Sequence, residues 1–299
     1  WWRAEQCAPV ASELPFTGGW FVFLGYEVAM EIEPTLHLPA SPDAVVATAL
    51  RIAAALIHDR RTGRTEIVME SGHRAVHGAI LADLARLTAH AARPIIVEEC
   101  REDDPARHLR AIELAKGHIA AGDIYQANLS REWGARLEAS ALSADLFAAL
   151  CTANPGGFAG IAALGAQTIV SSSPERLIAI RAGVVSTRPI AGTRPRAYDR
   201  SSDALDGALL VAHPKERAEH IMLIDLERSD LGRVCEAGSV EVDELMVVES
   251  YAHVHHIVSN VRGRLRHGLS PIDALRAVFP GGTITGVPKG TANKALQRR

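Results

Sequence analysis

Glu216 and Glu219 are the two residues whose type and spacing best suit the binding of a cation. They belong to the stretch "HPKERAEHIMLIDLERSDLGRV", which Pro214 opens and which is predicted to be one long helix. Residues three apart share a helix face, so the two carboxylates repel each other unless a positive charge sits between them. Carboxylate oxygens suit a hard divalent ion such as magnesium, Mg²⁺. The alternative is that both glutamates face water in the first turn, where they favour the helix dipole.

An arginine-rich bend is the second feature suited to chemistry. The stretch "TRPIAGTRPR", residues 187–196, places three arginines around Ala191, Gly192 and Thr193. Its two prolines and its glycine make it too irregular for a helix or a long strand. Because guanidinium groups pair with carboxylates and phosphates, we expect this bend to face an anionic small molecule.

Two further motifs contain candidates for acid–base chemistry. In "HVHH" the histidines lack a third ligand with zinc spacing, and neighbours in a strand point to opposite faces. We therefore expect His253, His255 and His256 to be structural, or a single one of them to act as an acid–base group. "SSSPERL" has no nucleophile elbow, so its Glu175 is a better candidate than its serines. That glutamate is a base or a hydrogen-bonding group, or it pairs with a nearby arginine.

The glycine-rich stretch "FPGGTITGVPKG" is predicted to be a loop. Val287 and Pro288 separate Gly286 from Lys289, so the loop fails the pattern of an ATP-binding P-loop. The backbone N–H groups of residues 281–283 are still suited to holding a carboxylate.

Several helices are expected to position these motifs. Apolar residues at helical spacing predict a helix from residue 74 to residue 91. Asp104 and Pro105 predict the start of another, which ends near Gly122. A further helix is expected over residues 141–153, and Ser270 begins a near capping box at the start of a short helix.

Strands are expected between these helices. The glycine-punctuated residues 14–34 indicate a buried strand pair, residues 45–70 indicate two strands around a turn with Gly63, and Ala182-Gly183 indicates a hairpin. Further strands are predicted for "GFAGIAAL", "QTIVSSS", "SVEVDELMVVESY" and "HHIVSNVRGRL". Helices and strands mix without strict β-α-β alternation, so we expect an α+β fold.

The composition limits the class of protein. The chain has 299 residues, of which 47% are hydrophobic and 22% charged, with a net charge of −3, as in a globular protein. No region is dominated by lysine and arginine, so no nucleic-acid partner is expected. No apolar run reaches the length of a membrane span, and no signal peptide is apparent, so no membrane association is expected. The four distant cysteines indicate reduced thiols in a cytoplasmic protein.

The chain also has a candidate boundary and an unusual start. The charged segment "EECREDDPA", residues 98–106, is expected to separate two domains, and a surface loop within one domain is the alternative. Because the chain begins with Trp1-Trp2 and not with methionine, we expect its natural start to be missing.

Six motifs in order resemble the chorismate-utilising enzymes, which include anthranilate synthase component I and aminodeoxychorismate synthase component I. The motifs extend from about Ala111 to Lys289 and are "GDIYQANLS", "SSSPERL", "TRPIAGTRPR", "KERAEHIMLIDLERSDLGRV", "YAHVHHIVSNVRG" and "FPGGTITGVPK". The resemblance implies an α+β fold like that of anthranilate synthase component I, with packed, largely antiparallel sheets and flanking helices. It also implies an amino-terminal domain within residues 1–98 and a chorismate-binding catalytic domain over residues 106–299.

The resemblance implies a chorismate aminase that uses a metal ion and a partner subunit. Glu216 and Glu219 match glutamates of the family's metal site, where Mg²⁺ holds the ring carboxylate and helps the C4 hydroxyl group leave. The amino group would come as ammonia from a separate glutamine amidotransferase subunit, because this chain has no Cys-His glutaminase motif.

Five other residues take their expected roles from the same resemblance. Gly192 and Thr193 match the turn that contacts the substrate, and Thr283 matches a substrate-contacting threonine. Glu175 matches an active-site glutamate, and His256 matches the family's histidine near the leaving group.

Position 191 bears on the choice between two branches of the family. Aminodeoxychorismate synthases often have lysine there and anthranilate synthases have alanine, so Ala191 favours anthranilate. The strings "GGWFVFLGYE", "VHHIVS" and "FPGGTITG" favour the other branch. We therefore expect amination of chorismate to 4-amino-4-deoxychorismate, for 4-aminobenzoate and folate synthesis. Anthranilate synthase component I, an isochorismate- or salicylate-forming enzyme and an inactive remnant are the alternatives.

The end of the chain departs from the family. After Lys289 the family continues with a helix, further substrate contacts and the remaining metal glutamates, whereas this chain reads "GTANKALQRR" and stops. We expect a catalytic domain that is incomplete at its C-terminus, with apolar surface exposed and few ligands for Mg²⁺.

Overall fold

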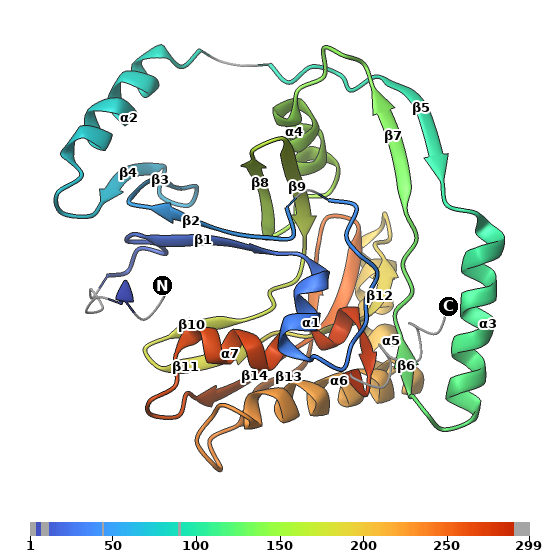
Figure 1. Ribbon diagram of the computed structural model, residues 1–299. Helices are drawn as coiled ribbons and strands as arrows, with labels where there is room; N and C mark the ends of the chain where they lie inside the picture. The colour runs from blue at the N-terminus through green and yellow to red at the C-terminus, as the bar shows by residue number, and fades with distance from the viewer. Residues whose placement is uncertain (1–3, 7–11, 44, 89–90, 290–299) are drawn as a thin grey trace. The chain divides into compact units, whose positions relative to one another are not determined.

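The computed structural model describes residues 4–6, 12–43, 45–88 and 91–289 of the chain (Figure 1). The chain divides into two compact units, which comprise Trp1–Val28 with Asp43–Ala91 and Ala29–Pro42 with Ala92–Arg299. The domain limits expected from the resemblance, residues 1–98 and 106–299, remain a prediction. The terminal residues on which the expectations about the chain ends depend, Trp1-Trp2 and 290–299, lie outside the described residues.

The first unit contains two antiparallel strand pairs and a helix, and the strands of only one pair, β3 and β4, are close in sequence. Its elements are β1 (Gly19–Leu24), η2 (Tyr26–Val28), β2 (Ala47–Ile52), β3 (Ala54–Asp59), β4 (Arg64–Met69) and α2 (Arg74–Arg86). β1 pairs with β2, and β3 pairs with β4. The predicted hairpin around Gly63 and the predicted helix from residue 74 are both confirmed, and the helix ends five residues earlier than expected.

The expected strand pair within residues 14–34 is wrong. β1 is the strand that forms there, and its partner β2 comes from a later part of the chain. At Gly25 the backbone passes so close to the Val46 carbonyl that a Cβ atom would lie 2.9 Å from its oxygen. The chain turns there into the 3-10 helix η2 and does not return as a second strand.

The second unit is built around a five-stranded antiparallel sheet. Its strands are β10 (Ala179–Arg181), β11 (Val184–Thr187), β12 (Ile190–Pro195), β13 (Glu241–Ser250) and β14 (Val254–Arg264). β14 is the central strand, because one of its edges pairs with β12 and then β11 while the other pairs with β13. The arginine-rich stretch therefore follows one edge of β14, alongside the histidines of that strand.

Two consecutive helices, α5 (Arg200–Ala212) and α6 (Pro214–Gly232), pack against β12 and β14. α7 (Pro271–Val278) packs against α6 in turn, and the core lies between these helices and the sheet. It includes the fully buried side chains of Val185, Leu231 and Val261. α6 and α7 were predicted from sequence, α7 with its capping box between Ser270 and Asp273, whereas α5 was not.

The second unit also contains elements outside this sheet and these three helices. They are α1 (Ala29–Ile32), β5 (Val97–Glu102), α3 (Pro105–Ala120), β6 (Gln126–Ala127), β7 (Trp133–Leu137), α4 (Ser143–Ala153), β8 (Phe158–Leu164), β9 (Gln167–Ser173), η3 (Gly282–Ile284) and β15 (Gly286–Val287). β5 pairs with β7, β8 with β9 and β6 with β15, all antiparallel. Asp104 caps α3 as predicted, because its carboxylate accepts a hydrogen bond of 2.9 Å from the Ala106 N–H. The α+β fold with antiparallel sheets is thus confirmed.

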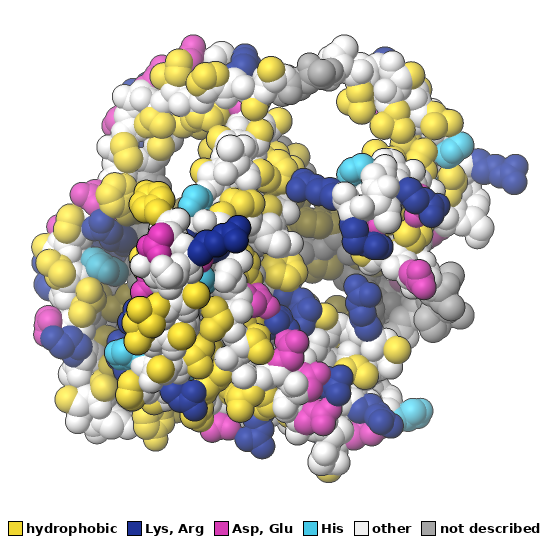
Figure 2. All heavy atoms as spheres, turned by 180° about the vertical axis from the view of Figure 1, so that it is seen from behind, with side chains coloured by type: hydrophobic (Ala, Val, Ile, Leu, Met, Phe, Trp, Pro, Cys, Tyr) yellow, Lys and Arg dark blue, Asp and Glu magenta, His cyan; other side chains and the backbone are white. Residues whose placement is uncertain are grey.

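The surface of the described chain includes many large apolar side chains. Figure 2 shows hydrophobic side chains lying among charged ones on the face opposite to that of Figure 1. Leu109 of α3 and Trp133 of β7 are about three-fifths exposed. Cys100, Cys151 and Cys235 are free thiols, as expected. Among the described residues, no helix has both the length and the apolar character needed to cross a membrane.

Candidate active site

Helix α6 presents polar side chains along the face that it buries against the sheet. Glu216, His220, Leu223, Glu227 and Asp230 follow one another at intervals of three or four residues, so they form a single stripe. His220, Glu227 and Asp230 are buried, and Glu216 is half-buried. Burying polar groups costs free energy unless they find partners. The groups that surround these side chains therefore indicate which ligands the helix could bind.

The first group of candidate residues surrounds Gly192, where β12 has a bulge. The pairing of β12 with β14 shifts between Ala191 and Thr193, and Gly192 has a φ of +64°, which favours glycine. A Cβ atom at this position would lie 3.1 Å from Glu216 Oε2, so the bulge lies directly against that carboxylate. The sequence predicted an irregular bend here. It is instead a six-residue strand, because the bulge absorbs the glycine without breaking the pairing.

His256 of β14 lies opposite the same bulge. Its Nδ1 lies 3.0 Å from Thr193 Oγ1 and 3.3 Å from the Gly192 carbonyl oxygen, and its ring meets that of Tyr251 edge-on. Both polar contacts use Nδ1, so Nε2 is the nitrogen that a ligand would meet. His255 points to the other face of the strand, as expected for neighbours, and its Nε2 lies 2.9 Å from Asp203 Oδ1.

Glu219 is held by a side chain from the short sheet beneath the glycine-rich loop. Gln126 Nε2 donates to Glu219 Oε1 over 3.2 Å, and Gln126 Oε1 is buried without a hydrogen-bond partner among the described residues. The half-buried carboxylates of Glu216 and Glu219 and the free amide oxygen are all hard oxygen donors. No cluster of three or more His, Cys, Asp or Glu side chains suited to a metal occurs in the described part of the chain. The donor set fits Mg²⁺, which ordinarily keeps several waters and uses few protein ligands.

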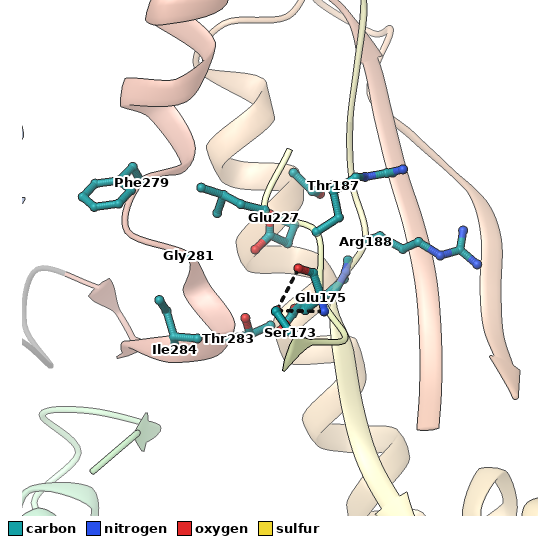
Figure 3. A pocket seen from close by; sticks show the side chains of 12 residues that line it. Ser173, Glu175, Thr187, Arg188, Glu227, Phe279, Gly281, Thr283 and Ile284 are labelled. Atoms are coloured by element: carbon teal, nitrogen blue, oxygen red, sulfur yellow. Dashed lines mark hydrogen bonds between the residues drawn. The ribbon is translucent and has the colours of Figure 1, made fainter. Parts of the chain in front are cut away.

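The second group of candidate residues lines a cavity of about 190 Å³ at the other end of this region (Figure 3). Glu175 follows β9, and its Oε1 accepts a hydrogen bond of 3.3 Å from the Ile190 N–H, which ties it to the start of β12. Thr283, from η3, also lines the cavity and lies close to Glu175. Burial raises the pKa of Glu175, and hydrogen bonds from Thr283 and the Ile190 backbone only partly oppose this.

Glu227 is a member of this cavity that the sequence analysis missed. It comes from α6, is only 5% exposed, and points into the same space as Glu175 (Figure 3). Burial raises its pKa to about 7, while the nearby Lys289 ammonium group acts in the opposite direction. A sequence signal existed, because Glu227 lies eleven residues after Glu216 and so on the same helix face.

Lys289 ends the described part of the glycine-rich loop. Its ammonium group makes a structural contact and does not face an open phosphate-binding site. Its Nζ pairs with the buried carboxylate of Asp230 and donates to the Val278 carbonyl oxygen over 3.0 Å. Arg233 binds the other oxygen of Asp230 at 2.8 Å. The motif "GVPK" thus anchors the loop to α6, which agrees with its failure to match a P-loop.

The structure therefore places the eight predicted site residues in two neighbouring groups. Ala191, Gly192, Thr193, Glu216 and His256 meet around the bulge, and Ala191 is buried there in the strand. Glu219 is on the adjoining turn of α6, held by β6, while Glu175 and Thr283 line the cavity with Glu227. The two groups share β12, and eleven residues of α6 separate Glu216 from Glu227, about 16 Å along the helix axis.

Comparisons with a family model and with individual proteins indicate the same family. The model of the chorismate binding enzyme family matches residues 3–299. An anthranilate synthase component I-like protein of Synechocystis is 38% identical over 94% of this chain and 58% of its own length. Aminodeoxychorismate synthase component 1 of Klebsiella aerogenes is 38% identical over 95% of this chain and 62% of its own length.

Solved structures agree with the sequence relatives. The crystal structure of anthranilate synthase component I from Streptococcus pneumoniae superposes with a TM-score of 0.86 at 27% identity, covering 99% of this chain and 68% of that one. The chain spans about three-fifths of the length of the two curated relatives named above. It belongs to the family of chorismate-binding enzymes.

Proposed function

We propose that this chain aminates chorismate to 4-amino-4-deoxychorismate, with ammonia supplied by a separate glutamine amidotransferase subunit, in 4-aminobenzoate synthesis. Membership of the family supports chorismate as the substrate. The observation that carries the proposal is the convergence of Gly192, Glu216 and His256 from three separate motifs on one β-bulge. The chain spans about three-fifths of the length of these relatives, so we propose their activity for this chain.

The glutamates of α6 would hold the metal ion. Glu216 and Glu219 would bind Mg²⁺ and leave positions for water and for a carboxylate of the substrate. When bound, the ion supplies positive charge that binds this carboxylate and stabilises the departing hydroxyl group. The Gln126 amide fixes the orientation of Glu219 through its hydrogen bond and adds an oxygen that faces no other described partner.

Two residues of the chain are suited to moving the proton that the leaving hydroxyl group needs. Glu175 holds a proton more strongly than an ordinary glutamate because it is buried, which suits a general acid. His256 is oriented by Thr193 and by the Gly192 carbonyl through Nδ1, so its Nε2 is presented to the bulge. Departure of the C4 hydroxyl as water would leave the ring open to attack by ammonia.

Anthranilate formation is the second candidate, and one residue favours it. Ala191 is buried in β12 next to the bulge, where aminodeoxychorismate synthases often have a lysine. A methyl group leaves no amine at this position to add to the ring. Relatives of both kinds match the chain at similar identity, so position 191 and the product are the features that separate the two reactions.

The test is to incubate the chain with chorismate, Mg²⁺ and an ammonium salt, and to identify the product. Anthranilate is fluorescent, whereas 4-amino-4-deoxychorismate gives 4-aminobenzoate only after a lyase is added. The E216Q variant is expected to lose turnover, whereas D225N, on the exposed face of the same helix, keeps it. Isochorismate as the product, or chorismate left intact by the wild-type chain, refutes the amination proposal.

A further inference from the structure

The cavity beside Glu175 gathers polar atoms that have no hydrogen-bond partner among the described residues. Six buried side-chain N or O atoms of the described residues have no hydrogen-bond partner, and three of them belong to residues that line this one cavity. They are Glu227 Oε2, Thr187 Oγ1 and Arg176 Nε. Glu227 and Thr187 are more than nine-tenths buried. Buried polar groups in native proteins are nearly always satisfied, so this cavity is built around a small polar occupant.

Among the described side chains that line the cavity, negative charges outnumber the positive charges that are not already paired with a carboxylate. Two carboxylates, Glu175 and Glu227, face it, and both are held there in a largely desolvated setting. Arg188 also lines it, but its guanidinium group is bound by two other glutamates, Glu244 and Glu249. The remaining cation is Arg176, whose terminal nitrogen donates to Ser186 and Asn260.

The groups that face Glu227 from each neighbouring element do not balance its charge either. Lys289 lowers its pKa, but the ammonium group of that lysine is already bound by Asp230, which raises it. Glu175, from the loop after β9, also raises it, whereas the nearby hydroxyl group of Thr187 in β11 lowers it. With both glutamates ionised, the described residues therefore leave one negative charge of the cavity unbalanced, and a proton or a small cation would balance it.

We propose that this cavity is the subsite for ammonium, with Glu227 as the group that binds the ion and takes a proton from it. This inference rests on the proposed amination. Ammonium is about the size of water and donates hydrogen bonds in four directions, which suits the oxygens of Glu227, Thr187 and the nearby Glu175. Arg176 Nε is itself a donor, so ammonium does not satisfy it. Transfer breaks one N–H bond and forms one O–H bond on Glu227. The electron pair stays on nitrogen, which becomes the ammonia nucleophile.

The position of Glu227 agrees with this role. Glu175, which we assign to the leaving hydroxyl group, lines the same cavity, so the nucleophile would form next to the group that opens the ring to attack. A pKa of about 7 lets Glu227 accept a proton near neutral pH and release it again. Neither the metal-site glutamates nor His256 lines this cavity, so the ammonium subsite is separate from the residues that would hold the chorismate carboxylate.

Steady-state kinetics with ammonium as the varied substrate tests the proposal. E227Q is expected to raise the KM for ammonium about tenfold, the effect of losing one charge-assisted hydrogen bond, and to leave the KM for chorismate within about twofold. T187V should raise the KM for ammonium by less, and D225N on the exposed face of α6 should change neither constant. Equal changes in both KM values, or none, overturn the subsite. Absence of any aminated product from the wild-type chain refutes the proposed function instead.

Infrared spectroscopy tests ammonium binding without turnover. The band of the protonated Glu227 carboxyl group, identified by its loss in E227Q, is followed across pH with and without ammonium chloride. Bound ammonium stabilises the carboxylate, so the midpoint of this titration should move to lower pH, and potassium, which has a similar size and no N–H groups, should move it less. No shift, or equal shifts with both ions, overturns the proposal. A specific shift with ammonium supports the subsite even if amination itself fails.

Discussion

Replacing Gly192 with alanine should damage both the stability and the function of the second unit. Gly192 has a φ of +64°, and an L-residue in this region costs about 1–2 kcal/mol. The new methyl group would also lie 3.1 Å from Glu216 Oε2 and 3.2 Å from both Ile257 Cδ1 and Leu210 Cδ1. Such overpacking costs a further ~1–3 kcal/mol. We therefore expect the free energy of unfolding to fall by roughly 2–5 kcal/mol, and turnover to fall because Glu216 must move.

Gly183 provides the matched control. It has a φ of +77° in the hairpin between β10 and β11 of the same sheet, and a Cβ atom there would meet nothing within 4 Å. G183A should therefore lose only the conformational part, about 1–2 kcal/mol, and should keep its turnover. Urea unfolding followed by circular dichroism gives the stabilities, and product formation from chorismate gives the activity. If G192A is no less stable than G183A and equally active, the bulge does not press against Glu216 and the geometry argued for the site is wrong.

Three further predictions follow from buried charges. The raised pKa of Glu175 keeps its proton-donating form up to a higher pH than in an ordinary glutamate, and activity should fall once this proton is lost. E175Q should lower kcat and remove this fall in activity at high pH. An unchanged pH profile contradicts the role of Glu175 as the acid. The pKa of Glu227, about 7 in the folded state and ordinarily 4.5, contributes stability that is full below pH 4.5 and is lost as pH rises to 7. This loss is on the order of 3 kcal/mol and should be absent from E227Q in unfolding measured at each pH. K289M leaves the buried Asp230 carboxylate paired with Arg233 alone and should cost about 1–3 kcal/mol. The double variant K289M/D230L should recover much of this loss, and a single variant as stable as the wild type would show that the lysine does not stabilise the buried carboxylate.

Local signals predicted the helices of this chain well. Asp104 and Ser270 mark the starts of α3 and α7 because each side chain accepts from a backbone N–H of the first turn, a contact that needs no distant residue. α5 begins with a signal of the same kind, because the Asp199 side chain accepts a hydrogen bond from the Ser202 N–H. It was not predicted because no apolar periodicity marked the helix. Capping residues and apolar spacing each marked helices that the other missed, since α2 has no side-chain cap.

Pairings between distant strands could not be predicted in the same way. The glycines of residues 14–34 indicated close backbone approach, but nothing local states that β1 pairs with residues 47–52. The bend at Gly192 is a similar case, because a positive φ fits both a turn and a bulge. Its partner strand decides between them, and that strand lies more than sixty residues later.

Glu227 shows why part of the candidate site was missed. On a helix with an apolar buried face, a glutamate in the stripe is conspicuous, but the stripe of α6 also contains Glu216, His220 and Asp230. The hydrophobic pattern therefore does not show which face of α6 is buried. Only the tertiary structure shows that Glu227 is buried and without a hydrogen-bond partner for Oε2.

The polar stripe of α6 also explains how the proposed metal site and ammonium subsite are kept at a fixed distance from each other. A helix is rigid, so the distance from Glu216 to Glu227, about 16 Å along its axis, is fixed by eleven residues of backbone. β12 follows the same path, with Gly192 against Glu216 and with Thr187, which precedes the strand's first residue by three, beside Glu227. A cation at one end and ammonium at the other would thus be held by one helix and by the short segment from the end of β11 to the bulge of β12. Burial of His220, Glu227 and Asp230 lowers the stability of the fold, and apolar residues there would pack at lower cost. That the stripe is polar is most simply explained if both of its ends serve the same reaction.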